Sequence, residues 1–176
     1  MQYFVGYLIE GNTSEYYKKI TSDLGWKFDI KNLSEHIPPH LTLKIPFETD
    51  SIEDFENYVS KKIENLSGMD LVVDGFEKFD GKRMTIFLKV NAGENIKTIE
   101  NVVDYLESYD EDIKKLPRPL ALHTSIARFL SPEKCKDIWN YLQEIPSPYF
   151  NLIFNNLTIF KLVDDVWEIH KIFYFK

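Results

Sequence analysis

The chain has 176 residues, of which 44% are hydrophobic, so it can bury the core of one ordinary globular domain. Its 7 glycines and 8 prolines are too few for a fibrous or low-complexity protein. A net charge of −7 and a pI near 5.1 argue against binding to long duplex nucleic acid, because that affinity depends on many Lys and Arg side chains, but they leave room for an RNA end or a nucleotide.

The first half of the chain predicts two strands, each followed by a helix. Residues 3–9 are rich in β-forming side chains, and Thr13 with Ser14 can cap a helix. Residues 40–45 alternate polar and apolar side chains, as a half-buried strand does. Ser51 can cap a second helix. Its apolar stripe consists of Ile52, Phe55, Val59, Ile63 and Leu66.

The second half predicts further strands and helices. Residues 71–79 and 84–90 read as strands joined by a tight turn at Asp80-Gly81. A helix with an apolar side follows, and residues 121–129 are again strand-like. Ser131 and Pro132 fit a cap and a first helical position. The C-terminal part predicts strands over residues 150–163 and 166–175, with a turn at Asp164-Asp165.

Targeting signals are not evident in the sequence. Residues 3–9 form a short apolar run without a basic flank or a small-residue cleavage site, so they read as a strand. No apolar stretch approaches the roughly 20 residues that a spanning helix needs. Cys135 has no cysteine partner, which excludes a disulfide framework and favours a reducing compartment. We therefore expect a cytoplasmic protein in which Cys135 is a small buried side chain.

The predicted elements repeat along the chain. Three landmarks recur at offsets of 82, 83 and 84 residues, which are the pairs Val5 and Phe87, His40 and His123, and Asp80 and Asp164. Each half reads strand, helix, histidine strand, helix, strand. We therefore expect residues 1–176 to form a single bilobal α+β domain of two interleaved pseudo-repeats. A chain of mixed elements without duplication is the alternative.

The two histidine strands carry the same polar pair. Side chains of a strand alternate between its faces, so His40 shares a face with Thr42, and His123 shares one with Ser125. In a pseudo-symmetric molecule both pairs face one cleft. One neutral imidazole can then take a proton from an attacking oxygen while an imidazolium gives one to the leaving oxygen. The hydroxyls can hydrogen-bond the non-bridging oxygens of a phosphate, and this chemistry requires no metal.

Residues 40–43, His-Leu-Thr-Leu, and residues 123–126, His-Thr-Ser-Ile, give the chain its family resemblance. It resembles the 2H phosphoesterase superfamily, in its 2′-5′ RNA ligase-like, cyclic phosphodiesterase branch. The first motif matches fully and the second has Ser in place of the commoner Thr. The resemblance implies antiparallel sheets lining a central cleft with helices outside, acid and base roles for His40 and His123, phosphate binding by Thr42 and Ser125, and no metal or cofactor.

The resemblance also implies a substrate class. It points to an RNA end or nucleotide with a 2′,3′-cyclic phosphate, or to a 2′-5′ linkage, including reversible 2′-5′ RNA ligase activity. We expect a monomer with no membrane partner. The alternative function is a non-catalytic nucleotide- or protein-binding module on the same fold. Two histidines and two hydroxyls favour the enzyme, because a binding site has no need of two proton-transfer groups. Which histidine is the acid stays open.

Two basic residues and a threonine lie close to these motifs. Lys44 is in phase with His40, so it can reach a phosphate, and a solvated lysine at the rim is the alternative. Arg128 follows His123 by five residues, and some relatives have a basic residue there. Simple alternation puts Arg128 on the opposite face, so a role for it requires a bulge or a strand end. Thr124 occupies a position that faces the core.

Other functional interpretations of the histidines and of Ser125 are less favoured. His36 and His40 have the spacing of a helical zinc pair, but Pro38 and Pro39 between them break a helix. His170 has no acidic or histidine partner at an obvious spacing, so a structural role is preferred. Ser125 as a nucleophile lacks the Gly-rich turn that such a serine needs.

Overall fold

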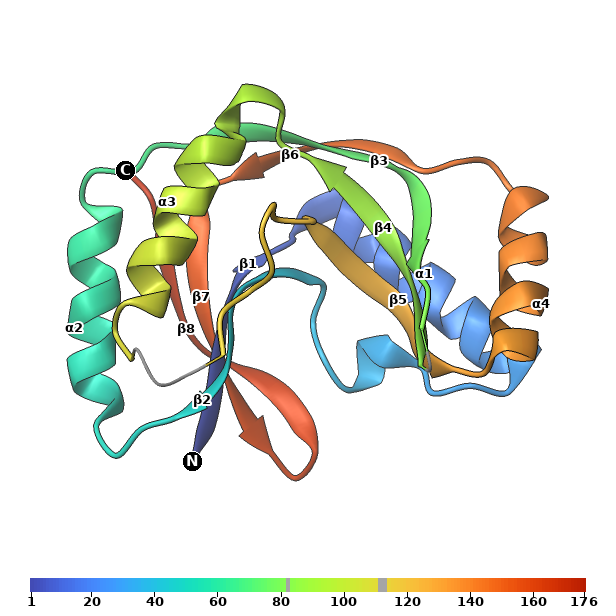
Figure 1. Cartoon of the computed structure of the whole chain (residues 1–176), viewed down its shortest axis with the longest axis horizontal. Helices are drawn as coiled ribbons and strands as arrows, with labels where there is room; N and C mark the ends of the chain where they lie inside the picture. Colours follow the sequence, from blue (N-terminus) through green and yellow to red (C-terminus); the bar gives the residue numbers. More distant parts are fainter. Residues whose placement is uncertain (82, 111–113) are drawn as a thin grey trace.

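The computed structural model describes residues 1–81, 83–110 and 114–176, which form two four-stranded sheets with helices outside them (Figure 1). The first sheet consists, in spatial order, of β2 (His40–Glu48), β1 (Gln2–Leu8), β7 (Asn156–Val163) and β8 (Val166–Tyr174). The second consists of β5 (His123–Leu130), β4 (Met84–Asn91), β3 (Met69–Phe79) and β6 (Tyr149–Phe154). All neighbouring strands are antiparallel, so the predicted α+β fold with antiparallel sheets is confirmed.

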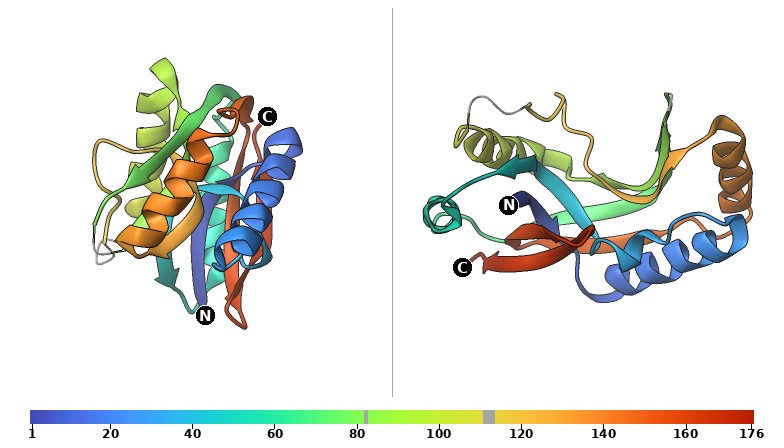
Figure 2. Two further views of the ribbon diagram at one scale, coloured as in Figure 1. Left: turned by 90° about the vertical axis from the view of Figure 1, so that its right-hand side faces the viewer. Right: turned by 90° about the horizontal axis from the view of Figure 1, so that it is seen from below.

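The α-helices of the described residues lie on the outside of the sheets (Figure 2). They are α1 (Gly11–Phe28), α2 (Ile52–Ile63), α3 (Ile96–Glu107) and α4 (Pro132–Gln143), with short 3₁₀ turns η1 (Leu33–Glu35) and η2 (Gly93–Asn95). The first lobe comprises the first sheet with α2 and α3, and the second lobe comprises the second sheet with α1 and α4 (Figure 1).

Two of the three predicted helix caps are found. The Ser51 hydroxyl accepts the amide of Asp54 at 3.4 Å, and the Ser131 hydroxyl accepts that of Lys134 at 3.2 Å. Each satisfies an amide that has no partner within the helix. The cap at Thr13-Ser14 is wrong, because α1 begins earlier, at Gly11, and Thr13 is buried in its first turn.

The C-terminal strands differ from the prediction at Asn155. The expected strand over residues 150–163 is two strands, β6 in the second sheet and β7 in the first. The break follows from the buried side chain of Asn156, which accepts the amide of Leu8 at 3.0 Å and donates to its carbonyl at 3.1 Å. This side chain takes the place of a strand partner and redirects the chain. The turn predicted at Asp164-Asp165 is found between β7 and β8.

The pseudo-repeats are interleaved. The two sheets correspond strand for strand, with β1, β2, β7 and β8 matching β4, β5, β3 and β6. Strands are therefore exchanged between the halves, since β3 of the first half pairs with β4, and β7 of the second half pairs with β1. The helices α1 and α3 are exchanged as well, because α1 follows β1 but packs on β5, and α3 follows β4 but packs on β2. The predicted duplication is thus confirmed, with each lobe built from both halves of the chain.

The register corrects two of the predicted correspondences. Val5 is paired with Lys44, and Ile86 is paired with Ala127, so Val5 corresponds to Ile86 and not to Phe87. The turns after β3 and β7 are not equivalent either. The first leads to β4, the counterpart of β1, whereas the second leads to β8, the counterpart of β6. The histidine strands β2 and β5 remain equivalent edge strands.

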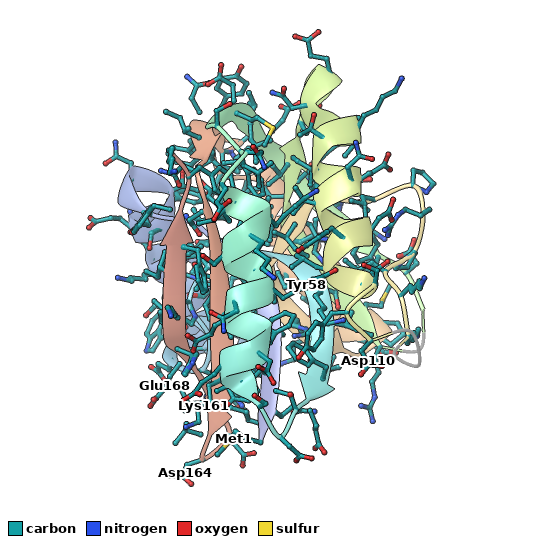
Figure 3. All side chains as sticks on the ribbon, turned by 90° about the vertical axis from the view of Figure 1, so that its left-hand side faces the viewer. Met1, Tyr58, Asp110, Lys161, Asp164 and Glu168 are labelled. Atoms are coloured by element: carbon teal, nitrogen blue, oxygen red, sulfur yellow. The ribbon has the colours of Figure 1, made fainter. Side chains whose placement is uncertain are left out.

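The first lobe is closed on its outer side by α2 and α3, the face shown in Figure 3. Tyr58 of α2 and Tyr105 of α3 stack with ring centroids 4.2 Å apart. Each hydroxyl donates to the other residue's backbone carbonyl, at 2.6 Å and 3.0 Å. These contacts join α2 to α3, and α3 packs on β2, the strand that begins with His40. In the part of the chain that the structure describes, no helix has the length and apolar character to cross a membrane.

Candidate active site

Both histidine strands contain the same β-bulge. In β2, Thr42 is paired with Gly6 and Lys44 with Val5, so Leu43 is an extra residue. In β5, Ser125 is paired with Phe87 and Ala127 with Ile86, so Ile126 is the extra residue. One extra residue reverses the alternation of side chains beyond it. Each motif therefore begins with a histidine and ends at a bulge.

The bulges decide the positions of the two basic residues. Arg128, beyond Ile126, is brought to the same side as His123 and Ser125. A role for Arg128 at the site required such a bulge. Lys44, beyond Leu43, is turned inward and is 1% exposed. Lys44 is not among the residues that line the cavity of the histidines, and the alternative of a solvated lysine at the rim is wrong.

One small cavity lies between the two lobes. Its volume is about 80 Å³, and it is lined by Tyr17, Leu33, Ile37, His40, Thr42, His123, Ser125 and Arg128. The structure thus brings together both histidines, both hydroxyls and Arg128, from strands on different sheets. Three of the lining residues were not predicted from the sequence, and they come from α1 and from the segment around η1.

The two imidazole rings are held in the same way. Nδ1 of His40 donates to the carbonyl of Pro38 at 2.8 Å, and Nδ1 of His123 donates to the carbonyl of Ala121 at 2.6 Å. A carbonyl can only accept, so the proton of each neutral ring lies on Nδ1. Nε2 of each ring is then left as a proton acceptor when the ring is neutral and as a donor when it is charged.

Aromatic side chains fix the planes of the rings. His40 packs against Phe4 and Phe160, with ring centroids 4.8 Å and 5.5 Å away. His123 packs against Phe79 and Phe87, both at 4.9 Å. Phe160 and Phe79 belong to the exchanged strands β7 and β3. The exchange of strands therefore supplies an aromatic support to each histidine.

Burial and positive charge keep the histidines neutral. Burial lowers the pKa of His40 to about 4, with smaller effects in the same direction from Arg128 and His123. Burial and Arg128 also lower the pKa of His123 below its usual value. The hydrogen bond from each Nδ1 to a carbonyl opposes these shifts. Both rings are therefore neutral near pH 7, and a bound anion favours protonation.

Tyr17 is the unpredicted polar residue of the cavity. Its helical spacing places it on the apolar face of α1, where it is indeed buried. Burial raises its pKa, so the phenol keeps its proton and can donate a hydrogen bond. The signal in the sequence is that a tyrosine on an apolar helix face carries a polar atom that needs a partner. That signal does not say where the partner lies.

The buried Lys44 belongs to another cluster. Its ammonium group lies 5.1 Å from the ring centroid of Phe47, and the carboxylates of Asp110 and Glu107 stabilise its charge. Burial nevertheless lowers the pKa of Lys44. Glu107 also accepts from Arg118 at 3.2 Å and from the amide of Leu116 at 2.7 Å. This cluster ties β2 to α3 and to the segment that leads to β5.

The other histidines are separate from the cavity. His170 lies 2.8 Å from a carboxylate oxygen of Glu56 on α2, a partner so far away in the sequence that spacing could not indicate it. His36 follows η1, and its carbonyl accepts the amide of Trp167 at 2.8 Å. Among residues 1–81, 83–110 and 114–176, no three His, Cys, Asp or Glu side chains are grouped so as to hold a metal ion.

The architecture defines a class of two-lobed proteins with known structures. TT0787 of Thermus thermophilus has a TM-score of 0.69 and 13% identity, covering 99% of this chain and 97% of that one. LigT of E. coli, complexed with 3′-AMP, has a TM-score of 0.62 and 13% identity, covering 99% and 98%. At this identity the likeness concerns the fold.

The sequence comparisons define the family. The model of the 2′-5′ RNA ligase superfamily matches residues 25–165, which include both histidine motifs. A Bacillus pumilus (strain SAFR-032) protein named "Putative phosphoesterase" is 24% identical over 140 residues, covering 78% of this chain and 79% of that protein. The chain therefore belongs to the 2′-5′ RNA ligase superfamily, and the resemblance inferred from the two motifs is confirmed.

Proposed function

We propose that the protein is a metal-independent phosphodiesterase that acts on 2′,3′-cyclic phosphates or 2′-5′ linkages of RNA or nucleotides. The observation that carries the proposal is the equivalence of His40 and His123 around one cavity. Each ring has Nδ1 fixed on a carbonyl and Nε2 available to a ligand, and each has a hydroxyl two residues along its strand. A phosphate between them meets two proton-transfer groups from opposite lobes.

The reaction is an in-line displacement at phosphorus. Nε2 of one neutral histidine takes a proton from the attacking water as the new P–O bond forms. Nε2 of the other histidine, protonated, gives its proton to the ribose oxygen as the P–O bond to that oxygen breaks. With a 5′-hydroxyl in place of water as the attacking group, the same two proton transfers would join that oxygen to phosphorus as a 2′-5′ linkage, and the roles of the histidines reverse when the linkage is opened again to the cyclic phosphate. Both proton transfers use side chains of this chain.

The remaining polar groups of the cavity match the charge on the phosphate. The hydroxyls of Thr42 and Ser125 donate to non-bridging oxygens, where charge accumulates in the transition state. Arg128 adds a fixed positive charge beside both histidines. An anionic phosphate also reverses the effect of burial on the imidazoles, so that one ring can be protonated in the complex.

The relatives support this class of substrate. LigT, which shares the fold, has been crystallised with 3′-AMP, a nucleotide with a phosphate on the ribose. The Bacillus pumilus relative carries the name of a phosphoesterase. We infer that the same cavity in this chain holds a ribose phosphate.

The test is hydrolysis of 2′,3′-cyclic nucleotides and of RNA that ends in a 2′,3′-cyclic phosphate. His40→Ala and His123→Ala should each lower kcat by about 10² to 10⁴ without changing the circular dichroism spectrum. His170→Ala, outside the cavity, is the matched control and should keep normal turnover. EDTA should have no effect, and the dependence of kcat/KM on pH should be bell-shaped. Near-normal rates for either cavity variant would contradict the mechanism. Nucleotide binding without any turnover would favour a binding module.

A further inference from the structure

Phe129 has an unusual backbone conformation directly after Arg128. The described residues other than glycine with positive φ are Asp29, Asp164, Asp165 and Phe129. Aspartate tolerates this region in turns and at helix ends, because its short polar side chain bonds locally. Phenylalanine has no such bond to make, so its φ of 59° is strained.

A second bulge in β5 imposes this conformation. Ala127 is paired with Ile86 and Leu130 with Met84, so Arg128 and Phe129 together oppose one residue of β4. A bulge of this kind commonly has glycine at its left-handed position, where a side chain costs free energy. Glycine would therefore fit the backbone here better than phenylalanine does. The backbone conformation therefore gives no reason for an aromatic side chain at position 129.

The first lobe has the same bulge without the strain. Lys44 is paired with Val5 and Phe47 with Tyr3, so the equivalent of Phe129 is Pro46. Proline is fixed at a negative φ and lacks both an aromatic ring and an amide donor. The two lobes thus differ at this point, and only β5 presents an aromatic side chain there.

The ring of Phe129 is exposed and lies close to two arginines. It is 65% exposed, so it contributes little to the core. The guanidinium carbon of Arg128 lies 5.0 Å from the ring centroid, and that of Arg83 lies 5.6 Å from it. Arg128 also lines the cavity of the histidines. An aromatic surface and two positive charges are therefore continuous with the proposed catalytic cavity, in a chain with a net charge of −7.

We propose that Arg83, Phe129 and Arg128 form a subsite for the nucleotide next to the reacting phosphate, so that an RNA chain is a better substrate than a mononucleotide. The proposal rests on the proposed function. A nucleobase stacks on the exposed ring, since stacking on an aromatic side chain is available to every base. Arg83 contacts the adjoining phosphate, and Arg128 bridges this subsite and the cavity.

Binding is measured with a fluorescein-labelled short oligoribonucleotide that ends in a 3′-phosphate, by fluorescence anisotropy. Phe129→Gly should weaken binding by about 5-fold to 100-fold, the range of one stacked base, while its Tm stays equal or rises because the strain is relieved. Phe129→Trp should bind at least as well as wild type. Tyr149→Ala is the matched control, since Tyr149 is 66% exposed on β6, the strand of this sheet farthest from β5.

Turnover separates the two proposals. Phe129→Gly should raise KM for an oligoribonucleotide with a 2′,3′-cyclic end and leave kcat/KM for a 2′,3′-cyclic mononucleotide within about twofold, because that substrate does not reach the ring. Unchanged RNA binding by Phe129→Gly, equal loss with both substrates, or no RNA binding by the wild type overturns the subsite. RNA binding that depends on Phe129, without turnover of either substrate, supports the subsite and contradicts the proposed hydrolysis.

Discussion

The histidines show how one side chain acquires its chemistry from its surroundings. His40 and His123 have the same ordinary pKa, the same carbonyl partner two residues earlier, and the same aromatic packing. Burial keeps both neutral, which prepares either one to accept a proton. The cavity is therefore symmetric in its groups, and the placement of the substrate decides which ring acts as the acid.

The lowered pKa of His40 predicts a dependence of stability on pH. In the folded protein the ring stays neutral down to about pH 4, whereas in the unfolded chain it is protonated near pH 6.5. The unfolded state therefore binds more protons in this range, and the stability present above pH 6.5 is lost as the pH falls through 4. Urea unfolding measures the free energy of unfolding at pH 7.5 and at pH 4.5. Its decrease between these pH values should be larger in wild type than in His40→Gln by roughly 2 to 3 kcal/mol. Equal losses would contradict the shift.

Lys44 has a role in stability that its position in the motif does not suggest. Lys44→Met should lower the free energy of unfolding by about 1 to 3 kcal/mol, because the carboxylates near it lose a buried partner. The kcat of Lys44→Met should stay within about twofold of the wild-type value, since Lys44 lies away from the cavity. Denaturant unfolding and steady-state kinetics measure the two effects. A large loss of turnover at unchanged stability would instead place the ammonium group at the phosphate.

At the scale of the elements, each histidine strand depends on its neighbour for position. Leu8 of β1 is paired with His40, and Asn156 holds the backbone of Leu8 from the other side. Gly6 is paired with Thr42, close behind the histidine. The position of the His40 imidazole thus depends on how closely β1 lies to β2, and a change in the distance between these strands moves the histidine.

Gly6 tests this dependence. A Cβ at Gly6 would lie 2.8 Å from the carbonyl oxygen of Leu41 and 3.3 Å from the ring of Phe160, so β1 and β2 must separate. Gly6→Ala should lower the free energy of unfolding by roughly 1 to 3 kcal/mol and lower kcat by about tenfold or more, as the histidine shifts. Unfolding and turnover assays measure this. Gly68→Ala is the control, because its closest contact, at 3.0 Å, is the movable side chain of Ile153. Normal turnover in Gly6→Ala would show that β1 does not position His40.

At the scale of the whole molecule, the exchange of β3 and β7 makes each lobe depend on both halves of the chain. Without β7 and β8, the first sheet retains two strands, fewer than a stable sheet needs. Most of the buried apolar residues of both sheets also belong to one continuous core, with a smaller cluster of Phe4, Leu8 and Phe160 in the first sheet. We therefore expect the two lobes to unfold as one cooperative unit.

This interleaving predicts a single unfolding transition. Trp139 lies on α4 in the second lobe and Trp167 lies on β8 in the first. Two variants should be made, each of which keeps only one of these tryptophans. In each variant, the midpoint of unfolding measured by fluorescence should equal the midpoint measured by far-UV circular dichroism. A fragment of residues 1–80 should not fold. Midpoints that differ between fluorescence and circular dichroism, or a folded fragment, would show that the lobes are independent.

The sequence by itself determined the features that depend on near neighbours. The alternation around His40 and His123 predicted both strands and their polar pairs, and Ser51 and Ser131 predicted two helix starts. The repeat of motifs predicted the duplication and the family. The sequence predicts these features because the faces of a strand and the cap of a helix depend only on residues a few positions apart.

The tertiary structure decided what depends on a partner far along the chain. The bulges that bring Arg128 to the cavity and bury Lys44 exist because β4 and β1 pair with β5 and β2 in a shifted register. Tyr17 reaches the cavity because α1 packs on the opposite lobe. At the break at Asn155, the side chain of Asn156 binds the backbone of Leu8, which is 148 positions away in the sequence. No local pattern encodes such pairings, because a register is a property of two segments and the free energy of their joint packing.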